Sequence, residues 1–157
     1  LVFNIKWMEE NNIKQQLIDI LRVPNKQNGV SKDDIIKQIV KKGDRLHERD
    51  ATLKTPLHLA CMETNNENIV KLLVEHKVDI DAKDSKENTP LLLACMQENN
   101  ERIIKLLLDN NASVNITNSE LKTPLHYAVN LINNDRVVTL LLENQANVKV
   151  RTKYGRT

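Results

Sequence analysis

The sequence predicts an all-α solenoid of helix-turn-helix repeats with hairpin-like loops, and three observations support this prediction. The dipeptide Thr-Pro recurs every 34 residues, with its threonine at Thr55, Thr89 and Thr123. Each copy precedes two short apolar-periodic segments separated by polar residues, which is typical of paired helices. Glycine and proline number only three and four in 157 residues, which argues against an all-β fold. Helices this short are unstable alone in water, so each pair must pack against its neighbours.

The composition excludes several classes of protein. Charged residues make up 28% of the chain, hydrophobic residues 40%, and the formal net charge is +2. These values exclude a highly charged disordered tail and give no gross basic signature for nucleic acid. Nowhere are 18 apolar residues consecutive, so we expect no membrane insertion in this segment. The chain begins with leucine and shows no signal segment, and we expect it to be part of a longer chain.

In residues 1–49, which precede the three Thr-Pro copies, the 34-residue repeat pattern is weaker. We predict an N-terminal capping helix and loop over 1–33, because apolar residues recur on one helical face and the segment 23–31 is rich in turn residues. Residues 34–49 match only the second helix of a repeat and are predicted to form a degenerate half repeat. Phe3 and Trp7 lie one helical turn apart, and they either pack within the cap or form a docking surface.

The full repeats are predicted over 50–83, 84–117 and 118–151, and 152–157 form the truncated start of a further one. In each repeat threonine is a good N-cap for the first helix, and proline suits its first turn. An acidic residue opens the second helix, where negative charge is favourable. A pair of asparagines precedes it, which we interpret as a slightly enlarged turn and not as a binding motif. The acidic residues are Glu67, Glu101 and Asp135, and the pairs are 65–66, 99–100 and 133–134.

The three Thr-Pro copies begin the segments TPLHLAC, TPLLLAC and TPLHYAV. These three in-phase copies resemble the ankyrin repeat, in which a turn, T-P-L-H-x-A and a second helix follow one another. The resemblance implies an ankyrin-type α-solenoid that acts as a protein–protein interaction scaffold through a preformed surface. It also implies that His58 and His126 brace neighbouring loops through hydrogen bonds, whereas the second repeat carries Leu92 at that position.

The sequence departs from the ankyrin pattern at positions where that family usually places glycine. One such position follows each second helix, and another lies at the tip of each hairpin-like loop. Glycine adopts left-handed backbone freely, and a replacement costs about 1 kcal/mol if that conformation is kept. We therefore expect the hairpin tips to deviate from the usual shape. The replacements are Lys77, Asn111 and Gln145 after the helices and Leu53, Glu87 and Leu121 at the tips. Glycine is kept after the second helix only at Gly43 of the half repeat, and at the tips only at Gly155.

Candidate groups for chemistry are few. Cys61 and Cys95 share one column of the predicted core. Packed helices lie about 8–10 Å apart, beyond the roughly 7 Å between Cα atoms that a disulfide allows. We therefore expect two buried, reduced thiols and an intracellular, cytoplasmic protein. No histidine stands at a useful spacing from a nucleophile, and neither a Gly-rich phosphate loop nor metal-ligand spacing occurs. We predict that the chain is not an enzyme and takes no cofactor or metal.

The resemblance places partner binding on the hairpin tips and on the concave side of the first helices. Across the aligned positions, eight basic residues stand against two acidic ones, a net of +6 in a chain of net +2. We hypothesise that this surface binds an acidic protein segment, with apolar side chains providing adaptable contacts. Nucleic acid is disfavoured, because aromatic residues for base stacking are scarce. The candidate partner-binding residues are Arg49, Lys54, Met62, Lys83, Lys86, Met96, Lys122, Leu131, Arg151, Lys153, Tyr154 and Arg156.

Three alternatives stay open at this point. In the first, the basic surface is simply solvated and the true partner ignores it. In the second, the repeats are the regulatory or targeting arm of a larger enzyme, channel or secreted effector. In the third, they are a structural subunit of a large assembly, with Phe3 and Trp7 buried against another chain.

Overall fold

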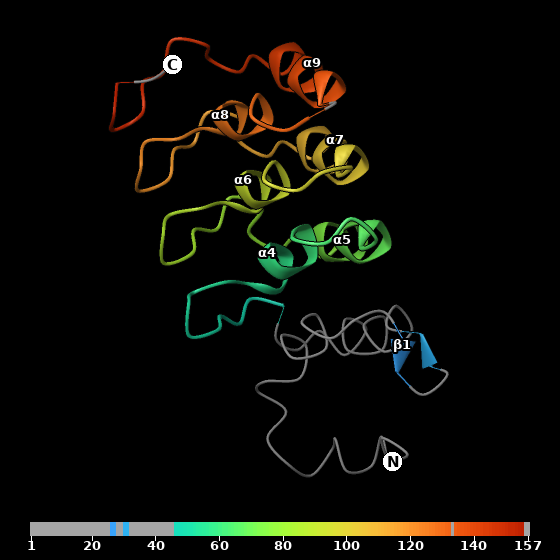
Figure 1. Cartoon of the computed structure of the whole chain (residues 1–157). Helices are drawn as coiled ribbons and strands as arrows, with labels where there is room; N and C mark the ends of the chain where they lie inside the picture. Colours follow the sequence, from blue (N-terminus) through green and yellow to red (C-terminus); the bar gives the residue numbers. More distant parts are fainter. Residues whose placement is uncertain (1–25, 28–29, 32–45, 133, 156–157) are drawn as a thin grey trace.

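The computed structural model describes residues 26–27, 30–31, 46–132 and 134–155. Within this part, helix pairs stack in sequence order and a loop projects from each pair toward the same side (Figure 1). The predicted all-α solenoid is therefore confirmed. The pairs are α4 (Pro56–Cys61) with α5 (Glu67–Glu75), α6 (Pro90–Ala94) with α7 (Glu101–Asp109), and α8 (Pro124–Ala128) with α9 (Asp135–Glu143).

Most of the N-terminal predictions fall outside the described residues. The predicted capping helix, with Phe3 and Trp7, lies there, and so do residues 34–45 of the half repeat. At the other end Arg156 also lies outside the described part.

A short antiparallel strand pair interrupts the segment that was predicted as a loop. The strand β1 (Lys26–Gln27) pairs with β2 (Val30–Ser31), and Lys26 lies opposite Ser31. A pair of this length has no independent stability, so it leaves the fold class unchanged.

The helices begin where the sequence predicts, because side chains satisfy backbone groups that are free at a helix start. The Thr55 hydroxyl accepts a hydrogen bond from the backbone N–H of His58 (3.4 Å), and the Thr89 hydroxyl accepts one from Leu92 (3.3 Å). Proline occupies the first position of α4, α6 and α8, where its missing N–H costs nothing. The second helices carry the predicted acidic residue in their first turn.

The second asparagine of each pair connects the two helices of its repeat. It is buried, and its side-chain amide donates to the carbonyl of an alanine six residues earlier, near the end of the first helix. In the second repeat, Asn100 also donates to the carbonyl of Cys61 (2.9 Å), and the preceding Asn99 has a left-handed φ of 57°. A structural role in the turn therefore accounts for these residues. The amide–carbonyl distances are 3.3 Å for Asn66–Ala60, 3.3 Å for Asn100–Ala94 and 3.2 Å for Asn134–Ala128.

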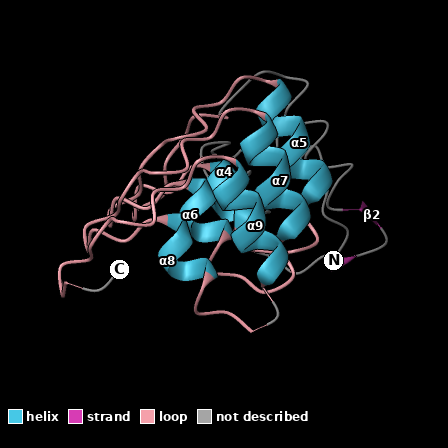
Figure 2. Ribbon diagram, turned by 90° about the horizontal axis from the view of Figure 1, so that it is seen from above, coloured by secondary structure: helices cyan, strands magenta, loops and turns pink. Residues whose placement is uncertain are grey.

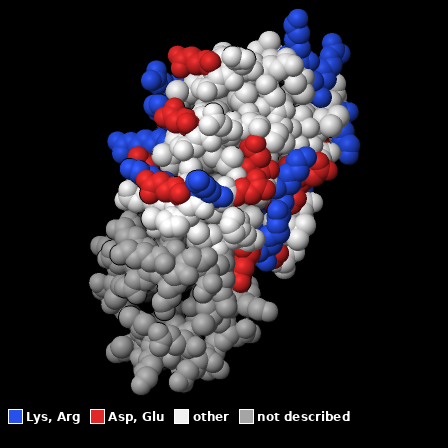
Figure 3. Space-filling model, turned by 180° about the vertical axis from the view of Figure 1, so that it is seen from behind, with Lys and Arg blue, Asp and Glu red and all other residues white. Residues whose placement is uncertain are grey.

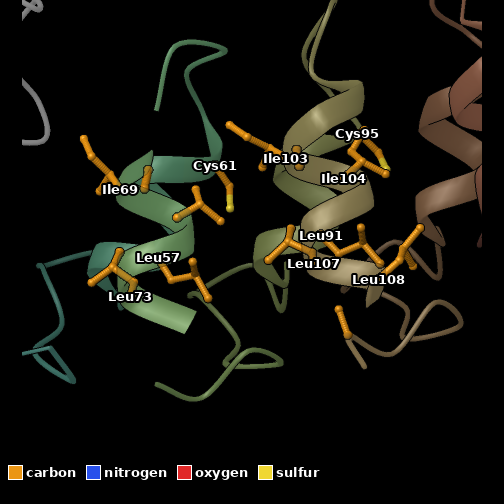
Figure 4. Packing of buried hydrophobic residues seen from close by; sticks show 14 of the residues in the cluster. Leu57, Cys61, Ile69, Leu73, Leu91, Cys95, Ile103, Ile104, Leu107 and Leu108 are labelled. Atoms are coloured by element: carbon orange, nitrogen blue, oxygen red, sulfur yellow. The ribbon is translucent and has the colours of Figure 1, made fainter. Parts of the chain in front are cut away.

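The hydrophobic core lies between two layers of helices. Seen from above, α4, α6 and α8 form the layer nearer the projecting loops, and α5, α7 and α9 form the other (Figure 2). Each helix packs on its partner and on the equivalent helix of the next repeat. Leucine and isoleucine side chains fill the space between them, together with the two cysteines (Figure 4). Wholly buried members include Leu57, Ile69, Leu73, Leu91, Ile103, Ile104, Leu107 and Leu141.

Candidate interaction surface

Four hairpin-like loops, which we call fingers, project from one side of the stack (Figure 1). We number them in chain order, because each belongs to a successive repeat. They comprise residues 49–54 (finger 1), 83–88 (finger 2), 117–122 (finger 3) and 151–155 (finger 4).

A buried side-chain oxygen fixes the shape of each of the first three fingers. In finger 2 the Asp84 carboxylate accepts hydrogen bonds from the backbone N–H groups of Lys86 (2.8 Å) and Asn88 (2.9 Å). Asp50 and Asn118 accept the equivalent pairs in fingers 1 and 3, at 2.7 to 3.1 Å. These three residues are not among the predicted site residues, although Asp, Asp and Asn recur at the 34-residue interval.

The carboxylate of Asp84 is stabilised in its charged form. Burial by itself would raise the pKa of Asp84. The hydrogen bonds from Asn88 and Lys86 outweigh burial, and the charge of Lys54, whose Nζ lies 3.8 Å away, adds to them. Together they lower the pKa below its ordinary value. Finger 2 therefore contains a charged Asp84 where finger 3 uses the neutral Asn118.

The fingertips keep one backbone conformation although their residues differ. The φ angle is 59° at Leu53, 61° at Glu87 and 59° at Leu121, compared with 72° at Gly155. In all four fingers the N–H of the tip residue donates to the carbonyl three residues earlier, at 2.9 Å. The expectation that tips without glycine would deviate is therefore wrong, because these hydrogen bonds impose the left-handed backbone on them. The helix-end replacements Lys77, Asn111 and Gln145 are left-handed as well, with φ of 56°, 66° and 65°.

Adjacent fingers are joined by backbone hydrogen bonds. A backbone N–H of each later finger donates to a carbonyl of the finger before it, at 2.9 to 3.0 Å. The Arg49 guanidinium adds a hydrogen bond of 2.6 Å to the carbonyl of Lys83. The fingers therefore form one continuous, preformed row, and a ligand that binds across it would incur little ordering cost on the protein side. The three backbone pairs are Ser85 with Thr52, Ser119 with Lys86, and Lys153 with Glu120.

His58 braces the first repeat against finger 2, as the resemblance implies. Its Nε2 lies 2.9 Å from the Asn88 carbonyl oxygen, and its Nδ1 lies 3.1 Å from the backbone nitrogen of Thr55. Because a carbonyl only accepts, these contacts assign the proton to Nε2. Burial lowers the pKa of His58, and this effect exceeds the opposing effects of the Asn88 hydrogen bond and the Asp84 charge. The native structure therefore favours the neutral imidazole.

The next two repeats differ from the first at this position. Leu92, which is wholly buried, replaces the histidine in the second repeat. Across that junction the side-chain amide of Asn118 instead donates to the Asn88 side-chain oxygen (2.9 Å). In the third repeat His126 Nδ1 accepts from the Thr123 N–H (3.1 Å), whereas its buried Nε2 has no partner among the described residues.

The structure divides the predicted cations into two groups. One group pairs with acidic residues of the fingers, which neutralises its charge even though exposed ion pairs contribute little stability. The other group consists of Arg49, Lys86, Arg151 and Lys153, which are exposed and have no ion pair within the described part of the chain. Of these, Arg49 donates to the backbone carbonyls of Leu53 (3.1 Å) and Lys83 (2.6 Å). The paired cations are Lys54 with Asp84 (3.8 Å), Lys83 with Glu87 (3.2 Å) and Lys122 with Glu120 (2.6 Å).

Three lysines from consecutive fingers act on one carboxylate. The pKa of Glu120 is lowered chiefly because Lys122 donates a hydrogen bond to it, and the charges of Lys86 and Lys153 lower it further. We call Lys86, Lys122 and Lys153 the lysine cluster. Since it places three positive charges around a single negative one, the cluster retains an excess that suits another acidic group.

The positive excess of the fingers is concentrated toward finger 4. The described finger residues comprise seven basic and four acidic side chains, a net of +3. This is smaller than the +6 of the aligned tip positions, mainly because Asp50, Asp84 and Glu87 lie in the same fingers. Seen from behind, Lys and Arg project along the upper right edge, and acidic and basic side chains mix further down (Figure 3).

The predicted apolar contacts lie in two places. Met62 and Met96 occupy equivalent positions of their repeats, at one and two residues after the ends of α4 and α6, and Leu131 lies one position further along its own repeat. Tyr154, next to the tip of finger 4, is 76% exposed. Within the fingers, the exposed apolar residues outside the predicted set are Leu53 (49%) and Leu121 (47%).

The two thiols of the described chain are buried between the helix layers. Cys61 and Cys95 are free thiols, and burial raises the pKa of both, which disfavours the reactive thiolate. Across the described ranges, no three His, Cys, Asp or Glu side chains are grouped to hold a metal ion. Among the helices that the structure describes, none has the length and apolarity needed to cross a bilayer.

Paired short helices, a 34-residue step and a row of stacked fingers define an α-solenoid of tandem repeats. Comparison with protein families matches a model of ankyrin repeats, in three copies, over residues 26–118 and 78–152. The chain therefore belongs to the ankyrin repeat family. Ankyrin repeats are generally protein–protein interaction modules and are typically non-enzymatic. A search of the curated proteins found no match.

Proposed function

We propose that this ankyrin repeat chain binds an acidic segment of a protein partner across fingers 2 to 4. The observation that carries the proposal is the lysine cluster, in which Lys86, Lys122 and Lys153 already stabilise the carboxylate of Glu120. An acidic side chain of a partner would enter the same positive environment. Lys86 and Lys153 supply the available charge, because neither has an ion pair within the described residues.

The concave side of the first helices supplies the apolar part of the proposed surface. Met62 and Met96 follow the first helices at equivalent positions, and their flexible side chains adapt to differently shaped ligands. Tyr154 adds an exposed aromatic group within finger 4. Because hydrogen bonds already hold the fingers in a row, the charged and apolar parts are presented together before binding.

The proposal is tested by titrating the ¹⁵N-labelled chain with a synthetic 16-residue peptide of alternating Glu and Ser. The same peptide with Gln in place of Glu is the uncharged comparison. At low salt the Glu peptide is expected to shift the backbone amide signals of Lys86, Glu120 and Lys153, and the shifts are expected to shrink as salt rises.

The double variant Lys86→Glu/Lys153→Glu is expected to weaken binding at least tenfold and to flatten its salt dependence. The matched control is Lys71→Glu/Lys77→Glu, which makes the same charge change at two exposed lysines on and directly after α5 that have no ion pair within the described residues. Equal shifts with the Gln peptide, or equal losses in the two double variants, would refute the proposal.

A further inference from the structure

Two leucines stand at fingertips whose backbone does not favour leucine. Seven non-glycine residues of the described chain have positive φ, and five of them are polar. The other two, Leu53 and Leu121, occupy the same position in fingers 1 and 3, each with φ of 59°. A left-handed backbone disfavours a side chain with a Cβ, so local conformation does not explain leucine there.

Packing does not explain these leucines either. Both are about half exposed, so each gains only part of the free energy that full burial of an apolar side chain provides. At the equivalent tip of finger 4, a Cβ added to Gly155 would meet no atom within 4 Å. The tip position is therefore open to its surroundings, and glycine satisfies it without strain. Strained positions with exposed apolar side chains are typical of binding surfaces.

We infer that Leu53 and Leu121 are apolar anchors for the same acidic partner segment, which must itself carry two apolar side chains. This inference rests on the proposed function and specifies its ligand. Lys86 lies in the finger between the two leucines, and Lys122 follows Leu121 directly. The tip residue between them is Glu87, whose charge is offset by Lys83 at 3.2 Å. The unpaired Lys86 is therefore the charge that finger 2 presents between the two apolar tips, which suits an acidic group between two apolar ones in the ligand.

The spacing of the leucines sets the spacing required in the ligand. They are two repeat steps apart, and packed helices lie about 8–10 Å from each other, so the anchors are separated by roughly 16–20 Å. An extended chain rises about 3.3 Å per residue. Apolar residues about five or six positions apart in an extended acidic segment would therefore reach both tips.

The test uses a displayed library of random 16-residue peptides, selected in parallel on the wild-type chain and on Leu53→Gly/Leu121→Gly. Glycine accepts the left-handed backbone, so the variant is expected to fold with a melting temperature within about 3 °C of the wild type. Peptides recovered only on the wild type are expected to be acidic and to carry two apolar residues at this spacing. Each leucine removed is expected to weaken their binding about tenfold.

The matched control is Leu142→Ala, which removes a leucine of similar exposure (45%) from α9 and is expected to bind like the wild type. Recovery of the same peptides on the wild type and the leucine variant, or of none on either, overturns the inference. Leucine-dependent self-association in sedimentation also overturns it, because the occupant would then be a second copy. If Lys86→Glu/Lys153→Glu loses binding of the acidic peptides but Leu53→Gly/Leu121→Gly keeps it, the proposed function is supported and the inference that the leucines are anchors is refuted.

Discussion

Replacing His58 with leucine tests whether the histidine brace between the first repeat and finger 2 contributes to stability. The second repeat shows that leucine fits this position, because Leu92 is wholly buried there. The substitution therefore removes hydrogen bonds without introducing a clash. It also removes a titratable group whose pKa is lowered by burial.

The expected destabilisation follows from the contacts that are lost. The hydrogen bond from Nε2 to the Asn88 carbonyl contributes about 1 kcal/mol net, since that carbonyl keeps a second bond from the Asp84 N–H (3.0 Å). The Thr55 N–H loses its acceptor while buried, which costs about 1–3 kcal/mol. Burying the more apolar leucine returns about 1 kcal/mol. We therefore expect His58→Leu to lower the free energy of unfolding by about 2 kcal/mol.

The assay is urea unfolding followed by circular dichroism at pH 7.5, with His126→Leu as the matched control. His126 makes the same contact to the N–H of its threonine, but its Nε2 has no partner in the described part of the chain. The control is therefore expected to cost about 1 kcal/mol less than His58→Leu. Comparable losses in the two variants would show that the bond to Asn88 contributes nothing.

Repeating the measurement at pH 5.5 tests the titration of His58. The unfolded histidine binds a proton near its ordinary pKa of 6.5, whereas the native pKa is lower. The stabilisation from neutral His58 is therefore complete above about pH 6.5 and is lost as the pH falls toward the native pKa. Wild-type stability should decrease from pH 7.5 to 5.5 by more than that of His58→Leu. Equal decreases would refute the assignment.

Two further predictions concern buried side chains that hold the repeats together. Asn100→Ala is expected to destabilise the chain by about 1 kcal/mol more than Asn134→Ala in urea unfolding, because only Asn100 also donates to the Cys61 carbonyl; equal losses would contradict this. The native pKa of Asp84 is lowered, so its stabilisation is present above about pH 4 and is lost as the pH falls through the native pKa. Asp84→Asn should keep finger 2 intact and lose less stability between pH 4.5 and 2.5, whereas Asp84→Ala should cost about 1–3 kcal/mol at pH 7 in the same assay.

Much of this protein could be predicted from the sequence because the fold is built from local rules repeated in phase. Threonine caps and prolines set the starts of α4, α6 and α8, and an acidic residue opens each of α5, α7 and α9. Each of these signals acts within one helical turn. Repetition at a constant interval then implies stacking, because no single helix pair buries its apolar stripe alone.

The candidate surface was less predictable, because its properties depend on contacts between fingers that are about 34 residues apart in the chain. Alignment selected Lys83, Lys86 and Lys122 alike, although only Lys86 lacks an acidic partner within the described residues. Which lysine is available depends on how each side chain is oriented, and composition does not contain that information.

The fingertips show most clearly which properties follow from the sequence and which depend on tertiary contacts. The sequence established that Leu53, Glu87 and Leu121 stand where glycine is usual, and local preference alone favours a change of backbone there. In the tertiary structure all three residues nevertheless keep the left-handed backbone. Each finger hydrogen-bonds to the next and to its own buried Asp or Asn, and these contacts together outweigh the small local cost of a left-handed leucine. Local propensities act within a few residues, whereas the conformation of a finger is set by its neighbours in the stack.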